Sequence, residues 1–337
     1  MDADWILKAV LFARNSSTGS AARRTAPRSP GTGAMEAILT WGTSIALELQ
    51  AASSPVLDGA FLWITQLGGE QFFLLLVPLV YWCLDKRLGL RLAYLYMFSV
   101  LANLWMKALF AAPRPYQYDS RVRLVGPAQT QPGFPSGHAQ SATAVWGLLG
   151  LRVRRNGMWW LAAVVVSLVS VSRVYLGVHF PHDVAAGVLL GVIAVVVFVR
   201  VEPVLSDRLA TLSFGAKIVT SAVAPIALLA VLVDRDTVAV TGALSGLSIG
   251  FVLQQRWAAF AVAGSLRQRA MRFVLGAVGL VAVYLGLRAV FGAIVSQEET
   301  ALWYLLRFLR YALVGLWAGG LWPMIAVRFG LAPREPR

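Results

Sequence analysis

Long apolar runs separated by short polar stretches make up most of the chain. The runs predict helices at about 70–84, 88–110, 137–151, 157–175, 181–201, 214–233, 237–254, 271–294 and 301–327. Helices of this kind cross a hydrocarbon layer of about 30 Å, and backbone in lipid must satisfy its own hydrogen bonds. We therefore predict an all-α fold, a polytopic transmembrane helix bundle of roughly nine spans.

The amino-terminal part of the chain has a different pattern. Residues 1–34 mix Ser, Thr, Arg, Gly and Pro, a composition typical of a disordered extension. Residues 36–53 repeat apolar side chains at helical spacing over a short length, which predicts an amphipathic helix on the membrane surface; a buried first helix of the bundle is the alternative. The predicted organisation is an extension at 1–34, an interfacial segment at 35–69, a catalytic core at 70–202 and accessory transmembrane helices at 203–337.

Basic residues alternate between the connections of the predicted spans. They gather in every second connection, whereas 176–182 and 295–300 contain none; the exception is 111–136, with three arginines. Cytoplasmic connections of membrane proteins carry the excess of Lys and Arg. The alternation therefore predicts that 111–136 and 176–182 lie on the same, extracytoplasmic face, most simply of the cell (inner) membrane, and that the carboxyl terminus is cytoplasmic.

Composition narrows the possible functions. Hydrophobic residues make up 58% of the chain, and the formal net charge is +14. The basic residues lie in short clusters between apolar runs with no aromatic-interleaved basic face, which argues for a bilayer surface and against nucleic acid. The single cysteine, Cys83, permits no intrachain disulfide and no thiolate zinc site. Three histidines without a matching carboxylate cluster give little support for a metal, so we expect no cofactor.

Three polar groups interrupt the apolar pattern. The first is KALFAAPRP, in which Lys107 and Arg114 are two helical turns apart, before Pro115 ends the helix. A charge buried this deep costs several kcal/mol unless it is paired. Either cation alone could snorkel to the headgroups instead.

The second group is PSGH, residues 135–138, immediately before an apolar run. Ser136 is placed as a helix N-cap, and Gly137 permits close approach of the backbone. Free N–H groups and the positive end of the helix dipole favour an anion there, beside His138. A Ser-Gly-His turn by itself is also ordinary loop chemistry.

The third group is SRVYLGVHFPHD, residues 172–183. Arg173 ends one span, and Asp183 follows His179 by four residues, so its carboxylate can accept a hydrogen bond from one imidazole nitrogen. The other nitrogen is then unprotonated and nucleophilic. A structural His–Asp cap is the simpler interpretation of this pair alone.

Together the groups provide cations, a helix-end anion pocket and two histidines, a set suited to a tetrahedral oxyanion and to phosphoryl transfer without a metal. The patterns K-x6-RP, PSGH and SR-x5-H-x3-D, in this order over residues 70–200, resemble the three signatures of the type 2 phosphatidic-acid phosphatase superfamily. That superfamily includes lipid phosphate phosphatases, undecaprenyl-diphosphate phosphatases, glucose-6-phosphatase and vanadium haloperoxidases.

The resemblance implies a role for each matching residue. His179 would be the nucleophile that forms a phosphohistidine, Asp183 would fix its tautomer, and His138 would protonate the leaving oxygen and then activate water. The phosphate would be held by Lys107, Arg114, Ser136, Gly137 and Arg173. His182 has no assigned family role, and we expect it to support the site.

The expected substrate is a lipid phosphate that enters from the bilayer, such as phosphatidate, phosphatidylglycerol phosphate, a sphingoid-base phosphate or a polyprenyl diphosphate. About nine spans, four of them after the core, resemble glucose-6-phosphatase more than six-span lipid phosphatases, so a soluble sugar phosphate is the alternative. A transporter with an anion site is a third hypothesis, because broken helices with polar ends occur there too.

Overall fold

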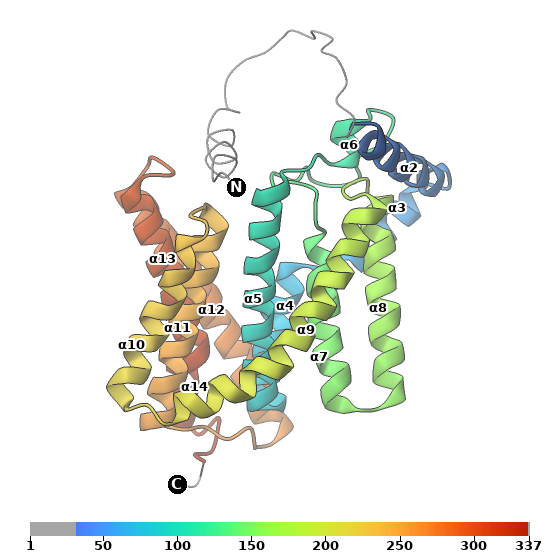
Figure 1. Cartoon of the computed structure of the whole chain (residues 1–337). Helices are drawn as coiled ribbons and strands as arrows, with labels where there is room; N and C mark the ends of the chain where they lie inside the picture. Colours follow the sequence, from blue (N-terminus) through green and yellow to red (C-terminus); the bar gives the residue numbers. More distant parts are fainter. Residues whose placement is uncertain (1–31, 336–337) are drawn as a thin grey trace.

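The computed structural model describes residues 32–335, and within them every regular element is a helix (Figure 1). The only strand-like pairing in this range is an isolated bridge between Phe260 and Arg334. The predicted all-α class is confirmed. The helices are α2 (Thr32–Ala51), α3 (Pro55–Ile64), α4 (Glu70–Leu79), α5 (Lys86–Phe110), α6 (Pro115–Tyr118), α7 (Gly137–Val153), α8 (Asn156–Tyr175), α9 (Pro181–Ala210), α10 (Phe214–Ala227), α11 (Arg235–Trp257), α12 (Leu266–Ile294), α13 (Ala301–Leu316) and α14 (Trp322–Arg328).

Short 3₁₀ and π turns extend several of these helices. The 3₁₀ turns are η1 (Thr65–Gly68) and η3 (Leu228–Ala230), and the π turns are η2 (Val80–Leu84) and η4 (Trp317–Leu321). Local sequence explains where the helices begin. Asp85 accepts a hydrogen bond from the Leu88 N–H at the start of α5, and Ser265 does the same for Gln268 in α12. Proline occupies the first position of α9, where no intrahelical donor is needed.

Each of the nine predicted spans coincides with a helix of the structure. Six helices in the described range are long and apolar enough to cross a membrane, or seven if the pair Pro55–Gly68 and Glu70–Leu84, bent by 48°, is one span. The two remaining segments are shorter: α7 has 17 residues, and the α10 segment is an apolar helix at Phe214–Ala230. A bundle of six to seven candidate spans is thus established, and the count of nine stays a prediction.

The helix predicted at 36–53 is α2, which lies across one end of the bundle (Figure 1). Its buried residue Ala46 packs against a cluster that includes Val174 and Val184, whereas Trp41 is exposed. The helix begins at Thr32, so it includes residues 32–34 of the predicted extension; the rest of that extension lies outside the described residues. The sequence did not predict α3, a short apolar helix that starts at a proline.

The bundle has two halves that meet at α5 and α4. The first half contains α7, α8 and α9, and the second half contains α10 to α14 (Figure 1). The π turn after α4 joins the halves, because the Tyr81 hydroxyl and the Trp82 indole N–H donate to the carbonyls of Gly319 and Ala318. The aromatic core around this turn includes Phe260 and other side chains of the second half.

Candidate active site

The polar connections 111–136 and 176–180 lie together at one end of the bundle. The Val125 N–H donates to the Leu176 carbonyl over 3.1 Å, and the Tyr116 N–H donates to the Gly177 carbonyl over 3.3 Å. Gly177 has φ of +74°, and a Cβ there would lie 2.4 Å from the Arg123 carbonyl oxygen, so only glycine fits. The proximity of the two connections agrees with the alternation of basic residues.

Small residues bring α9 close to the start of α7. The Ser136 N–H donates to the Asp183 carbonyl over 2.9 Å. One turn later, a Cβ on Gly187 would lie 2.4 Å from the Ser136 carbonyl oxygen, and a Cβ on Gly191 would lie 2.7 Å from that of Gln140. Because glycine lets helix backbones approach, these positions fix the PSGH turn against the His179–Asp183 segment.

His179 is buried between a carboxylate and a guanidinium group. Its Nδ1 lies 3.5 Å from Asp183 Oδ2, and its Nε2 lies 3.3 Å from Arg114 Nη1. Asp183 Oδ2 also accepts a hydrogen bond of 2.8 Å from the Phe180 N–H, which fixes the carboxylate. A guanidinium can only donate, so this arrangement favours a proton on Nδ1 and an unprotonated Nε2 that accepts from Arg114.

The electrostatic surroundings of His179 favour the neutral imidazole. Burial lowers the pKa of His179 well below its ordinary value, and the charges of Arg173, Arg114 and Lys107, together with nearby His138, lower it further. A neutral imidazole with an unprotonated Nε2 is the form that can act as a nucleophile.

Lys107 and Arg114 donate mainly to backbone carbonyls. Lys107 Nζ donates to the Pro132 carbonyl over 2.6 Å. Arg114 donates from Nε to the Gln131 carbonyl over 2.9 Å and from Nη1 to the Val178 carbonyl over 2.7 Å. These bonds orient the side chains and leave their positive charges without a carboxylate partner.

Arg173 is the third buried cation. Its Nη1 donates to the Thr65 hydroxyl over 2.8 Å, and its Nε is buried without a partner in the described range. Lys107, Arg114 and Arg173 are 6%, 3% and 4% exposed, and among residues 32–335 Asp183 is the one carboxylate in contact with the His179 ring. The site therefore has an excess of buried positive charge, which an anion would balance.

The PSGH turn is held by a buried polar network. Ser136 is the N-cap residue of α7, as its position in the sequence predicts, yet its Oγ makes no capping bond and has no partner in the described range. Asn103 donates to the Gln140 side chain over 2.8 Å, and Gln140 donates to the Ser99 carbonyl over 2.8 Å. A Cβ on Gly137 would lie 3.1 Å from Asn103 Oδ1. The Asn103–Gln140 network thus fixes the turn, and the Ser136 hydroxyl, which has no partner in the described range, can bind a ligand.

The other two histidines lie beside this centre. His138 is in the first turn of α7 and is half-buried. His182 Nε2 lies 3.3 Å from Asp183 Oδ1, and its ring stacks on Phe180 with centroids 5.2 Å apart. Asp183 thus has an imidazole nitrogen near each carboxylate oxygen, and a supporting role for His182 stays a prediction.

A hydrogen bond connects the loop beside the site to the second half of the bundle. The Gln131 side chain donates a short hydrogen bond to Asp236 of α11, and Arg307 of α13 lies 3.6 Å from the other Asp236 oxygen. Since the Gln131 carbonyl accepts from Arg114 Nε, a residue of the second half helps to fix a cation of the site.

Three of these supporting residues were missed in the sequence. Asn103 and Gln140 had a usable signal, because each is an amide in an apolar run, four residues from Lys107 and Ser136 respectively. Asp236 lies at the start of α11, 105 residues from its partner Gln131, and the sequence has no signal for this pairing. In residues 32–335, no group of three or more His, Cys, Asp or Glu side chains is arranged to hold a metal ion.

Two family models match the chain. The model described as PAP2 superfamily matches residues 88–206, and the one described as PAP2 superfamily phosphatase, transmembrane extension, matches residues 238–334. All eight predicted site residues lie within the first match.

Individual relatives are similar over part of their length. Glucose-6-phosphatase catalytic subunit 1 of Haplochromis nubilus is 30% identical over 47% of this chain and 52% of its own. The undecaprenyl-diphosphatase of Sulfolobus acidocaldarius is 33% identical over 40% of this chain and 66% of its own. The crystal structure of Aquifex aeolicus LpxE superposes with a TM-score of 0.43 at 25% identity, over 47% of this chain and 93% of its own. The chain thus spans about half the length of the glucose-6-phosphatase that it matches.

Proposed function

Because the chain belongs to the PAP2 superfamily, we propose that it is an integral membrane phosphatase that hydrolyses a lipid phosphomonoester or diphosphate through a phosphohistidine on His179. The observation that carries the proposal is the buried set of three cations around a neutral imidazole, with one carboxylate behind it. Such a set stabilises the charge of a phosphoryl group in transfer.

In the proposed first step, His179 Nε2 attacks phosphorus as the bond to the leaving oxygen breaks. Asp183 holds the Nδ1 proton and stabilises the positive charge that develops on the ring. His138 donates a proton to the leaving oxygen, so that an alcohol departs from a monoester, or a phosphate monoester from a diphosphate. Lys107, Arg114 and the other phosphate-binding groups hold the remaining phosphate oxygens.

In the second step, water attacks the phosphohistidine. His138, now neutral, accepts a proton from that water, and the bond between phosphorus and Nε2 breaks. Inorganic phosphate leaves, and His179 returns to its neutral form. The cations supply the positive charge that a metal provides in other phosphatases.

A lipid substrate is supported by exposed apolar side chains at the end of α5, next to the site. Leu109 and Phe110, which follow Lys107 on this helix, are 52% and 55% exposed. An acyl or prenyl chain can lie against this apolar surface while its phosphate reaches the cations. The similarity to an undecaprenyl-diphosphatase agrees with this choice.

A soluble sugar phosphate is the second candidate. It is favoured by the 30% identity with a glucose-6-phosphatase catalytic subunit. Both candidates require the same hydrolysis of a phosphate ester. They differ in the group that bears the phosphate, a lipid or a sugar.

The test is phosphate release by the purified full-length protein in detergent with EDTA. The substrates are phosphatidate, a polyprenyl diphosphate and glucose 6-phosphate. We expect turnover without a divalent metal, a higher kcat/KM for the lipids, and a loss of about 10⁴-fold or more in His179→Ala. Brief reaction with labelled substrate followed by alkaline denaturation should trap the phosphohistidine.

Four results would contradict the proposal. A requirement for divalent metal, or activity that survives in His179→Ala, would contradict the mechanism. Preference for glucose 6-phosphate would replace the lipid with the second candidate. Phosphate binding without turnover of any substrate, in protein that is monodisperse by gel filtration, would favour the transporter hypothesis.

A further inference from the structure

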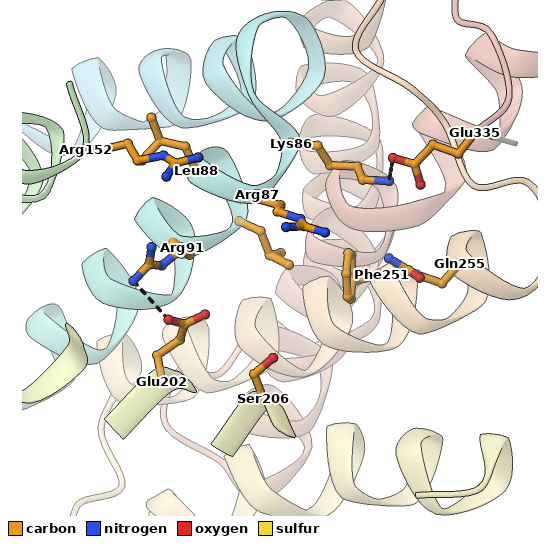
Figure 2. A pocket seen from close by; sticks show the side chains of 11 residues that line it. Lys86, Arg87, Leu88, Arg91, Arg152, Glu202, Ser206, Phe251, Gln255 and Glu335 are labelled. Atoms are coloured by element: carbon orange, nitrogen blue, oxygen red, sulfur yellow. Dashed lines mark ion pairs between the residues drawn. The ribbon is translucent and has the colours of Figure 1, made fainter. Parts of the chain in front are cut away.

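A second cationic site lies at the end of the bundle opposite the candidate active site. It is a cavity of about 640 Å³ between the starts and ends of several helices, lined by the charged residues Lys86, Arg87, Arg91, Arg152, Glu202 and Glu335 (Figure 2). Lys86 begins α5, and Lys107 follows it by 21 residues on the same helix, which corresponds to roughly 30 Å. The cavity is therefore too distant to be a subsite of the phosphatase centre.

Ion pairs satisfy only part of the charge in this cavity. Lys86 pairs with Glu335 at 2.6 Å, and Arg91 pairs with Glu202 at 3.0 Å. Figure 2 shows Arg87 between these two pairs; it has no carboxylate partner among the described residues. Arg152 is 3.7 Å from Asp85, which lies outside the lining. Arg87 and Arg152 thus give the cavity a net positive charge.

A smaller cavity of about 390 Å³ adjoins the first. It shares Arg91 and Arg152 and adds Arg154, and its other lining residues include Leu148 and Trp159. The lining of the combined hollow is divided between cations and apolar side chains such as Leu148 and Trp159. An amphiphile with a negative head fits this division better than a free phosphate, which has no apolar part.

The surroundings place the hollow at a membrane interface. Trp159 and Trp160 are 45% and 74% exposed at the start of α8, and Trp257 is 56% exposed at the end of α11. Exposed tryptophans gather where hydrocarbon meets headgroups. Basic pockets between helices at this depth bind the headgroups of anionic lipids.

We propose that this hollow binds an anionic glycerophospholipid, with the headgroup phosphate between Arg87, Arg91 and Arg152 and the acyl chains along the adjoining apolar surface. The lipid belongs to the leaflet opposite the phosphatase centre, so it acts as a resident ligand and not as the substrate. This proposal is independent of the proposed function.

The test is native mass spectrometry of the detergent-purified protein with phosphatidylglycerol or phosphatidylcholine of the same acyl chains. We expect preferential retention of phosphatidylglycerol, reduced about tenfold in the double variant Arg87→Gln/Arg152→Gln. The matched control is Arg155→Gln/Arg328→Gln, which removes two exposed charges from the same end of the molecule outside both cavities. It should retain the lipid as the parent does.

The single variant Arg87→Gln controls for misfolding of the double variant, because it breaks no ion pair of the described residues. Its retention of phosphatidylglycerol should fall about fivefold. Equal losses in the two double variants, or no preference for phosphatidylglycerol in the parent, would overturn the proposal. An excess of glycerol 3-phosphate distinguishes the source of the phosphate. Unchanged lipid retention supports a lipid site, whereas displacement would assign the hollow to a soluble anion.

Discussion

Glycines let α7 pack closely against α9 and α11 pack closely against α13. In the first pair, Gly187 faces the Ser136 carbonyl. In the second, Cβ atoms on Gly246 and Gly315 would lie 1.8 Å and 2.2 Å from the carbonyl oxygens of Ala312 and Ala243. Both pairs use small residues to let backbones touch, as is common in membranes.

The polar groups beside these contacts differ. In α11, the Thr241 and Ser248 hydroxyls each donate over 2.8 Å to a carbonyl of their own helix. At the start of α7, the Ser136 hydroxyl is buried without a partner in the described range, and Arg173 at the end of α8 has a free Nε. The same packing device thus lies beside hydroxyls bonded within their own helix in α11, where Thr237 Oγ1 is also buried without a partner in the described range, and beside a cluster of three buried cations at the ends of α7 and α8.

The largest expected difference between the halves concerns their buried arginines. Arg173→Gln should lower kcat by about 10²- to 10³-fold with little change in thermal stability, because it removes a proposed donor to the phosphate. Arg272 of α12 is fully buried and donates to the carbonyls of Ala261 and Ala263. Arg272→Gln should lower the melting temperature and leave the activity per folded molecule unchanged.

This contrast is checked by measuring phosphate release and the midpoint of thermal unfolding for both variants. The comparison fails if Arg173→Gln loses activity only in proportion to the folded protein lost, since Arg173 would then be as structural as Arg272.

The glycines give a smaller contrast. Gly187→Ala should displace the PSGH turn and lower kcat/KM by about 10²-fold, because small shifts of catalytic groups are costly. Gly246→Ala should instead destabilise the fold by about 1–3 kcal/mol through overpacking. The measurements are kcat/KM per monodisperse protein and the midpoint of thermal unfolding. Full activity in a destabilised Gly187→Ala protein would show that this contact serves packing alone.

Much of this architecture followed from periodicity and charge. The apolar runs identified every long helix after residue 70, and the alternation of basic residues predicted that 111–136 and 176–182 lie on the same face. Ser136 was recognisable as an N-cap because the apolar run begins directly after it. These features depend on local sequence, so a single sequence is enough to predict them.

Other features depend on contacts that local sequence does not encode. The bend of 48° between Pro55–Gly68 and Glu70–Leu84 depends on packing as well as on Gly69. The carbonyls that hold Lys107 and Arg114 come from an irregular loop, for which no periodic pattern exists. The partner of Gln131 lies 105 residues away. The roles of the eight predicted site residues stay predictions until activity is measured.

The smallest predicted effect tests the contact between the halves. Asp236→Ala removes the acceptor of the Gln131 side chain and should lower kcat/KM by about three- to tenfold, the equivalent of one hydrogen bond. Stability should change little, because the Asp236 side chain is 38% exposed and its pair with Arg307 is long. The matched control is Asp234→Ala. Asp234 caps α11 by accepting from the N–H groups of Asp236 and Thr237, so its loss should cost about 1 kcal/mol of stability at unchanged activity per folded molecule.

A double-mutant cycle separates positioning from a general effect of charge. If Asp236 acts through Gln131, then Gln131→Ala should lower kcat/KM as Asp236→Ala does, and the double variant should be no worse than either single variant. Additive losses would mean that Asp236 influences the site by another route. In that case the two halves would share a packing interface without a functional contact, and the polar core of the first half would be complete without the second.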